Sequence, residues 1–142
     1  MTRSPILGVS ACLFRAGQIL LVERHRPPYE GRFSLPGGRV EFGEPIASAI
    51  AREVAEETGL AIGRFVFHCL HEAIDADFHA VIAVHRAAEG LRPGTEPVAG
   101  DDARSLRFVP LEALAAMEAE GRLTDGLRRV VASAHRDHLA GL

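Results

Sequence analysis

The sequence predicts an α/β fold in which a mixed β-sheet is flanked by helices on its faces. Runs typical of β-strands come first along the chain, one amphipathic helical segment interrupts them, and helical periodicity takes over towards the C-terminus. The chain has 142 residues, of which 47% are hydrophobic, so it can bury one sizeable core. We therefore expect a single domain over residues 1–142.

The strand-like runs are bounded by residues that favour turns. Ile6 to Phe14 and Gln18 to Glu23 lie on either side of Arg15-Ala16-Gly17, which predicts a β-hairpin. Further strands are expected downstream, and the last of them is short. They are Phe65 to Ala73, Phe78 to Arg86 and Ser105 to Val109.

A turn and a helix are predicted between these groups of strands. The cluster Pro36-Gly37-Gly38 predicts a tight turn, followed by a short extended piece at Val40 to Phe42. A helix is then expected over residues 45–58, because Pro45 suits the first helical position and Gly59 suits a C-terminal stop.

Two more helices are expected after the last strand. Leu111 to Glu118 and Thr124 to Leu139 carry apolar residues at helical spacing, and Gly121 separates them. Thr124 or Asp125 is suited to cap the second helix, because a short polar side chain accepts a hydrogen bond from an N–H group of the first turn.

Charge and cysteine content exclude several kinds of partner and site. The formal net charge is −3 and the 16 cationic residues are all arginine, so no basic stripe for a nucleic-acid polymer is expected. Cys12 and Cys69 lie in apolar strand-like runs, which is typical of free buried thiols and not of a disulfide or a zinc site. The N-terminal residues lack a clear cleavage site and a run of about 18 apolar residues, which predicts a soluble cytoplasmic protein with no membrane partner.

The predicted helix over residues 45–58 has an acidic face next to an apolar stripe. Glu53, Glu56 and Glu57 are spaced at i, i+3 and i+4, so their carboxylates converge, repel one another and lose hydration unless a cation compensates. Oxygen ligands favour a hard cation such as Mg²⁺, which is usually held together with substrate phosphates. The alternative is an ordinary solvated helix face. The apolar stripe is expected to contain Ile46, Ala47, Ile50, Ala51, Val54 and Thr58.

The acidic residues belong to a longer pattern, G-x5-E-x7-R-E-U-x-E-E-x-G-U, in which U is aliphatic and every fixed position matches. This pattern is the Nudix box, and the chain resembles Nudix hydrolases, in particular MutT-like or ADP-ribose pyrophosphatase-like bacterial members. Residues 20–38 and 100–114 also resemble the segments of the family before and after the box. The matching residues are Gly38, Glu44, Arg52, Glu53, Val54, Glu56, Glu57, Gly59 and Leu60.

The resemblance implies a Nudix-type α/β/α sandwich and an enzyme that hydrolyses a nucleoside diphosphate linked to another moiety, X. The cofactor would be Mg²⁺, with Mn²⁺ as a substitute. The base would be Glu53 or an acid in a later loop, and Arg52 would orient a box carboxylate. Glu44 is expected to be a peripheral metal ligand or the partner of Arg52. The expected catalytic residues are Arg52, Glu53, Glu56 and Glu57, and the expected metal ligands are Glu53, Glu56, Glu57, Glu44 and a carbonyl of Gly37 or Gly38.

An irregular segment from Ala87 to Ala103 is expected to be a loop, since glycine and proline recur along it. The resemblance implies that an acid outside the box completes the metal site or acts as base, and Glu96 or Asp102 is favoured among the acids of this loop. Each is equally consistent with an ordinary solvated residue. The loop acids are Glu89, Glu96, Asp101 and Asp102.

No histidine is expected to have a catalytic role. His68 and His71 are three residues apart and would face opposite sides of a strand, so they do not form a metal-binding pair. His79 would contact the substrate only if its strand lines the cleft.

The sequence favours a substrate class without fixing the substrate. Residues 100–114 resemble proteins often grouped with ADP-ribose pyrophosphatases, so ADP-ribose or another nucleotide sugar is expected first. The alternative is a pyrophosphohydrolase that releases a nucleoside monophosphate and diphosphate from nucleoside triphosphates, including oxidised deoxynucleotides. A non-catalytic nucleotide-sensing module is the alternative from another class. The resemblance also allows a homodimer.

Overall fold

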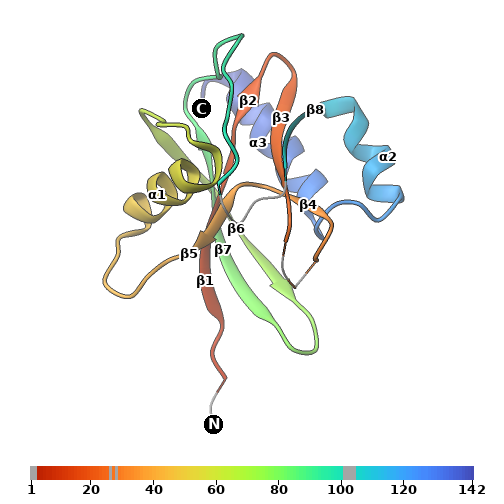
Figure 1. Ribbon diagram of the computed structural model, residues 1–142. Coiled ribbons are helices and arrows are strands. Elements are labelled where there is room, and N and C mark those ends of the chain that lie inside the picture. The colour runs from red at the N-terminus through yellow and green to blue at the C-terminus, as the bar shows by residue number, and fades with distance from the viewer. Residues whose placement is uncertain (1–2, 26, 28, 101–104) are drawn as a thin grey trace.

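The computed structural model describes residues 3–25, 27, 29–100 and 105–142, and its strands form two four-stranded sheets (Figure 1). In chain order the strands are β1 (Ile6–Cys12), β2 (Phe14–Arg15), β3 (Gln18–Glu23), β4 (Phe33–Ser34), β5 (Gly37–Arg39), β6 (Phe65–Ile74), β7 (His79–Ala87) and β8 (Leu106–Pro110). The first sheet has the order β5-β1-β7-β6, with β1 parallel to β7 and an antiparallel strand at each edge. In the second sheet, β3 pairs antiparallel with β2, β4 and β8.

Helices lie on both sides of these strands. Helix α1 (Ile46–Thr58) packs against β1 and β5, whereas α2 (Leu114–Ala119), which follows the 3-10 turn Leu111–Ala113, packs against α3 (Leu127–Ala140). In Figure 1, α1 lies on one side of the strands and the C-terminal helices lie on the other. This arrangement confirms the expected α/β fold. None of the helices in the described ranges combines the length and apolar character needed to cross a bilayer.

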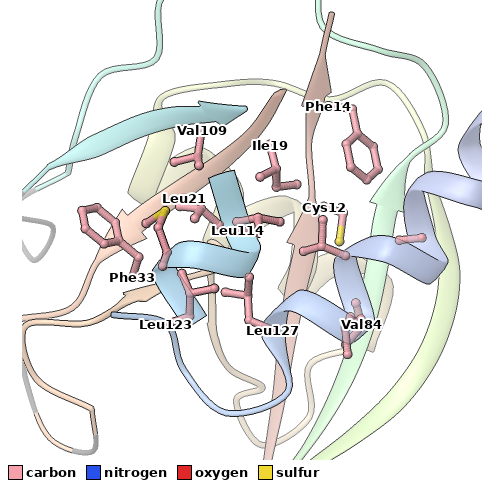
Figure 2. Close-up of a cluster of buried hydrophobic side chains, with 14 residues drawn as sticks. Cys12, Phe14, Ile19, Leu21, Phe33, Val84, Val109, Leu114, Leu123 and Leu127 are labelled. Carbon is pink, nitrogen blue, oxygen red and sulfur yellow. The ribbon is translucent and has the colours of Figure 1, made fainter. Parts of the chain in front are cut away.

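Two clusters of buried side chains hold the layers together. Figure 2 shows the first cluster, in which Leu114 and Leu127 from the C-terminal helices pack with Ile19 and Leu21 of β3. Leu20, between those two strand residues, belongs to the second cluster together with the buried residues of α1. Strand β3 is therefore buried on both faces, which explains its uninterrupted apolar run.

The first predicted strand is in fact two strands in different sheets. Strand β1 ends at Cys12 and β2 begins at Phe14, while Leu13 between them is fully buried and its carbonyl accepts a hydrogen bond from the Leu20 N–H at 3.1 Å. The sequence gives no sign of this break, because Cys12, Leu13 and Phe14 include no glycine or proline and both pieces are apolar. The later strands lie within one residue of their predicted ends.

The box helix begins and ends where the sequence predicts. Helix α1 starts after Pro45 and stops at Gly59, whose φ of 69° is a left-handed conformation that glycine adopts without strain. The predicted apolar stripe is partly wrong, because Ile46, Ala47 and Ala51 are exposed. Ala49, which the prediction left out, is fully buried. Alanine carries too little apolar surface for its position alone to indicate which edge of the stripe contacts the sheet.

The predicted cap of the last helix is also wrong. Gly126, with φ of 80°, precedes α3, and no side chain makes a capping hydrogen bond there. The carboxylate of Asp125 is used elsewhere, because it accepts a hydrogen bond from Tyr29 and pairs with Arg32. Contacts between distant segments have therefore replaced a local one.

The glycine pair at the start of the box is part of a strand and not the predicted tight turn. Gly37 and Gly38 lie in β5, are paired with β1, and neither has a positive φ. Glycine is needed at Gly37 because a Cβ there would overlap the carbonyl of Val9 on β1. The extended segment is therefore Gly37–Arg39, and not Val40 to Phe42 as expected.

Both cysteines are free thiols, as the sequence predicts. Burial raises the pKa of Cys12 to about 12, and it also raises the pKa of Cys69, which is half-buried. Because the thiolate is the reactive form, both side chains are poor nucleophiles at neutral pH.

One buried and one half-buried histidine are expected to make stability depend on pH. Burial lowers the pKa of His85 and of His138 in the folded protein. The unfolded chain, with ordinary pKa values near 6.5, then takes up protons first as the pH falls. The free energy of unfolding should be constant above about pH 7 and decrease below about pH 6.5. Urea unfolding at pH 7.5 and 5.5 measures this change, and a His85→Gln variant should show a weaker dependence; an equal dependence would contradict it.

Candidate active site

Arg52 is the centre of a hydrogen-bonded network on α1. Its guanidinium donates to both carboxylate oxygens of Glu44, at 2.7 Å from Nε and 2.8 Å from Nη2. Nη1 donates to Glu53 at 2.9 Å and to Glu56 at 3.4 Å. Nη2 also donates to the Arg39 carbonyl at 3.1 Å. Arg52 therefore connects the helix to β5 and to the loop that follows it.

The two best-shielded carboxylates of this network differ in their affinity for protons. The side chains of Glu44 and Glu53 are each 14% exposed. Hydrogen bonds from Arg52, and then one from the Glu41 backbone N–H, lower the pKa of Glu44 to about 2. Burial, reinforced by the charges of Glu56 and Glu44, raises the pKa of Glu53 in spite of the Arg52 contact. Glu44 is thus a permanently ionised partner of Arg52, whereas Glu53 is a stronger base than an ordinary glutamate.

Glu53 reaches β5 because Gly38 has no side chain. A Cβ at Gly38 would overlap the Glu53 carboxylate. The backbone of Gly38 is not left-handed, so glycine is required here for space and not for conformational freedom. The carboxylate of Glu53 is therefore held between the strand and Arg52.

The carbonyl of Gly37 faces the open edge of the first sheet. The Pro36 carbonyl accepts a hydrogen bond from β1, and the Val40 N–H donates one to β1. Along an antiparallel strand, residues whose N–H and C=O groups point to the neighbouring strand alternate with residues whose groups point away. The carbonyl of Gly38 therefore faces β1, whereas the carbonyls of Gly37 and Arg39 face away from it. The Arg39 carbonyl is bound by Arg52. Of the two glycine carbonyls, that of Gly37 is the one directed to the edge.

The oxygen atoms around this network are of the kinds that bind a divalent metal ion. Glu56 is 61% exposed, Glu57 lines a cavity, and the Gly37 carbonyl adds a second kind of oxygen donor. Within the described residues, no three His, Cys, Asp or Glu side chains converge closely enough to form a ready-made metal cluster. Mg²⁺ does not require one, because it is commonly held by one or two carboxylates with water and substrate phosphates. The residues present therefore fit such an ion.

The cavity beside the network has a volume of about 490 Å³. Its floor is one face of the sheet β5-β1-β7-β6, and its walls come from the loop after β3 and the start of α3. Arg24, Arg39 and Glu57 are among the charged residues that line it. Burial lowers the pKa of Arg24, and the charge of Glu57 opposes this shift. The cavity can therefore receive an anionic group near the box helix.

The weaker candidates from the sequence are not part of the described network. Glu89 and Glu96 are exposed, and neither lines this cavity. His79 lies 3.0 Å from the Glu72 carboxylate through Nε2 and is also absent from the described residues that line the cavity. Asp102, like its neighbour at position 101, lies outside the described residues.

A β-bulge makes the prediction for two histidines wrong. The register of β6 shifts at His68, so His68 and His71 both contact the C-terminal helical segment. His68 Nε2 lies 2.6 Å from Ser133 Oγ, and His71 Nε2 lies 3.1 Å from the Asp125 carbonyl. Strict alternation along the strand had predicted opposite faces.

Sequence reasoning missed several residues that line the cavity. Arg24 and Tyr29 come from the loop after β3, and Asp125 comes from the segment before α3. His71 lies two residues before the buried Ala73 on β6, so both face the same side of the sheet. This spacing could have indicated that His71 lines the cavity. No local sequence pattern indicates that Tyr29 contacts Asp125, because the two residues are 96 positions apart.

Comparison with known proteins places this chain in a family. The NUDIX domain model matches residues 4–132. An ADP-ribose pyrophosphatase from Methanocaldococcus jannaschii is 35% identical over 111 residues, which cover 78% of this chain and 64% of that protein. A Mycobacterium tuberculosis protein, provisionally named 8-oxo-dGTP diphosphatase 2, is 46% identical over 55 residues, which cover 38% of this chain and 39% of that protein.

A solved structure extends the likeness to almost the whole chain. The crystal structure of a MutT NUDIX hydrolase from Burkholderia pseudomallei superimposes with a TM-score of 0.76 and 31% identity, covering 92% of this chain and 98% of that chain. The chain spans less than two thirds of the length of the two curated relatives above. Since the domain model covers most of its residues, the protein belongs to the Nudix hydrolase family.

Proposed function

We propose that the protein hydrolyses the diphosphate linkage of a nucleoside diphosphate derivative, NDP-X, to a nucleoside monophosphate and a phosphorylated X. The observation that carries this proposal is the Arg52 network, which holds the Glu53 carboxylate against Gly38 next to a cavity lined by Glu57. ADP-ribose or another nucleotide sugar is the favoured substrate. The 35% identity to an ADP-ribose pyrophosphatase supports this choice.

The proposed cofactor is Mg²⁺, with Mn²⁺ as a substitute, and Nudix hydrolases generally use divalent metals. When bound, such an ion neutralises charge on the diphosphate and lowers the pKa of a bound water. Glu44 is assigned the role of partner of Arg52, since both of its carboxylate oxygens accept hydrogen bonds from that guanidinium. The proposed ligands are Glu53, Glu56, Glu57 and the Gly37 carbonyl.

Side chains of the protein supply orientation, charge and a base in this proposal. Arg52 fixes the position of Glu53, whose carboxylate would accept a proton from the attacking water. Arg24 and Arg39 line the cavity and bring positive charge to the anionic oxygens of the substrate. The face of the sheet that forms the cavity floor then orients the rest of the nucleotide.

A second candidate function uses the same residues on a different substrate. A pyrophosphohydrolase of nucleoside triphosphates, including oxidised deoxynucleotides, would release a nucleoside monophosphate and diphosphate. The 46% identity over 55 residues to a protein provisionally named as an 8-oxo-dGTP diphosphatase favours this alternative. Both candidates cleave a diphosphate linkage next to a nucleoside.

A hydrolysis screen with products identified by mass tests these proposals. The substrates are ADP-ribose, other nucleotide sugars, NADH and (deoxy)nucleoside triphosphates, including oxidised ones. We expect AMP and ribose 5-phosphate from ADP-ribose, with turnover abolished by EDTA and restored by excess Mg²⁺. Release of diphosphate from a triphosphate alone would favour the second candidate. Tight binding of nucleotides without any product, at every metal ion tested, would contradict hydrolysis and indicate a nucleotide sensor.

A further inference from the structure

The last turn of α1, which carries two of the proposed metal ligands, is only partly completed by the residues that follow it. A helix leaves the carbonyl groups of its last four residues without a partner inside the helix. In the described ranges, the chain directly after α1 gives one main-chain bond to this turn, from the Gly59 N–H to the Ala55 carbonyl at 2.9 Å. The Leu60 N–H donates to Thr58 Oγ1 instead, at 3.2 Å. The remaining carbonyls of the turn therefore depend on another part of the protein.

A segment of the loop after β7 supplies donors for two of these carbonyls. The Val98 N–H donates to the Thr58 carbonyl at 2.8 Å, and the Gly100 N–H donates to the Glu57 carbonyl at 3.2 Å. A Cβ at Gly100 would overlap the carbonyl of Glu56, so glycine is needed there for space. The segment thus contacts the main chain of both acids in the last turn.

The loop that leads to this segment, which spans residues 97–100 and which we call the clamp, is fixed to β2. The Leu91 N–H donates to the Phe14 carbonyl at 2.7 Å. Arg15 Nη1 donates to the Thr95 carbonyl at 2.9 Å. Strand β2 therefore supports the clamp, and the clamp connects the end of α1 to the second sheet.

The end of α3 shows that a helix of this chain can also be completed locally. The Gly141 N–H donates to the His138 carbonyl at 3.2 Å, and the Leu142 N–H donates to the Asp137 carbonyl at 3.0 Å. These bonds need no distant segment. The end of α1 differs, because its position depends on a loop from far along the chain.

We propose that Val98 and Gly100 are positioning residues for the divalent metal ion. Glu53 is held by Arg52, whereas Glu57 lies in the last turn of α1, and helix ends are where a helix frays. Because Mg²⁺ demands near-octahedral geometry, a shift of this turn relative to Glu53 lowers metal affinity. The clamp prevents the shift by holding the main chain of the turn. The ligand assignment rests on the proposed function, whereas the contact of the clamp with α1 does not.

Hydrogen exchange in the wild type tests this coupling without nucleotide. Coupling between two binding events is reciprocal, so a clamp that tightens metal binding about 10-fold is stabilised by the metal to the same extent. Exchange of the Val98 and Gly100 N–H groups, followed by NMR, should therefore slow about 10-fold when saturating Mg²⁺ is added. The Gly141 N–H at the end of α3 is the control and should exchange at an unchanged rate. Equal rates with and without Mg²⁺ at the clamp would overturn the proposal.

Variants of the clamp separate the effect of its N–H groups from that of its side chains. Val98→Pro removes the donor to the Thr58 carbonyl, and Gly100→Ala pushes the clamp away from α1. Each should weaken the binding of Mn²⁺ alone, measured by electron paramagnetic resonance, by about 10- to 100-fold, the range for a group that supports a metal ligand. Val98→Ala is the matched control, since it keeps the N–H and shortens a side chain that is 69% exposed. Its affinity for Mn²⁺ should equal that of the wild type.

A destabilised variant elsewhere separates positioning from general stability. Val131→Ala creates a cavity in the first buried cluster, which contains none of the buried apolar residues of α1. Its free energy of unfolding should fall, but its affinity for Mn²⁺ should stay that of the wild type. The proposal would be overturned if Val131→Ala weakened Mn²⁺ binding as much as the clamp variants do. Folded clamp variants that bind Mn²⁺ as tightly as the wild type would overturn it as well.

The positioning role and the proposed function can fail separately. If the clamp variants weaken Mn²⁺ binding but the screen finds no hydrolysis, the proposed function is wrong and the positioning role is supported. If the protein hydrolyses NDP-X while Gly100→Ala binds Mn²⁺ normally, the function stands and the positioning role is overturned. Glu57→Gln is the reference for the ligand set. Wild-type affinity for Mn²⁺ in that variant would contradict both the assignment of Glu57 as a ligand and the role of the clamp.

Discussion

Replacing Glu57 by Gln is expected to lower kcat/KM by about 100-fold or more while leaving the protein folded. Glu57 is the acid of α1 that lines the cavity among the described residues. Gln preserves the volume of the side chain but removes the negative charge that would hold a divalent ion. Loss of a group that only supports a metal ligand already costs about 10- to 100-fold, so loss of a ligand should cost more. Steady-state hydrolysis of the substrate found in the screen, at saturating Mg²⁺, measures the effect.

Glu112→Gln is the matched control for this variant, because Glu112 is an exposed acid on the 3-10 turn before α2. Its activity should equal that of the wild type. The free energy of unfolding of Glu57→Gln should differ from wild type by less than about 1 kcal/mol, the usual range for a partly exposed charge. Wild-type turnover in Glu57→Gln would remove Glu57 from the ligand set. Recovery of activity at Mg²⁺ concentrations above those that saturate the wild type would assign the loss to metal affinity and leave the chemical step intact.

The box helix and its acids could be predicted because the information is local. Pro45 and Gly59 mark the ends of α1, and a period of 3.6 residues places Glu53, Glu56 and Glu57 on adjoining turns. The contact of Arg52 with a box carboxylate was predicted from the family resemblance and not from periodicity. The bidentate contact of Arg52 with Glu44 is less local, since it depends on the path of the loop before the helix.

The far end of the cavity could not be predicted because it depends on contacts between distant segments. Tyr29 and Asp125 are 96 positions apart, and neither has a neighbour in sequence that indicates the other. Spacing suggested Asp125 as a helix cap, but the tyrosine hydroxyl and Arg32 compete for the same carboxylate. His71 shares a face with Ala73 by regular alternation, but its contact on the same side as His68 depends on the bulge at His68, which no glycine or proline marks.

Replacing Gly38 by Ala is expected to reduce activity strongly and stability moderately. A Cβ at this position would overlap the Glu53 carboxylate, which must then leave β5 and its contact with Arg52. Displacement of a catalytic group by about 1 Å can cost about 100-fold in rate. Crowding of a packed site usually costs about 1–3 kcal/mol. Hydrolysis rates and urea unfolding measure the two effects on the same protein sample.

Gly63→Ala is the control, because Gly63 has no positive φ and a Cβ there would meet nothing within 4 Å. That change should leave activity intact and stability equal or slightly higher, since alanine reduces the freedom of the unfolded chain. If Gly63→Ala and Gly38→Ala behaved alike, the close approach of Glu53 to β5 would be irrelevant to catalysis.

The double variant Gly38→Ala with Glu53→Asp separates crowding from chemistry. Aspartate is one methylene shorter, so its carboxylate withdraws from β5 and leaves room for the new Cβ. Stability should therefore recover towards that of Glu53→Asp alone, a coupling in the usual range of about 0.5–3 kcal/mol for residues in contact. Activity should not recover, because the carboxylate no longer lies between the strand and Arg52. Recovery of both would show that the position of Glu53 matters only for packing, and the base would then have to come from another acid.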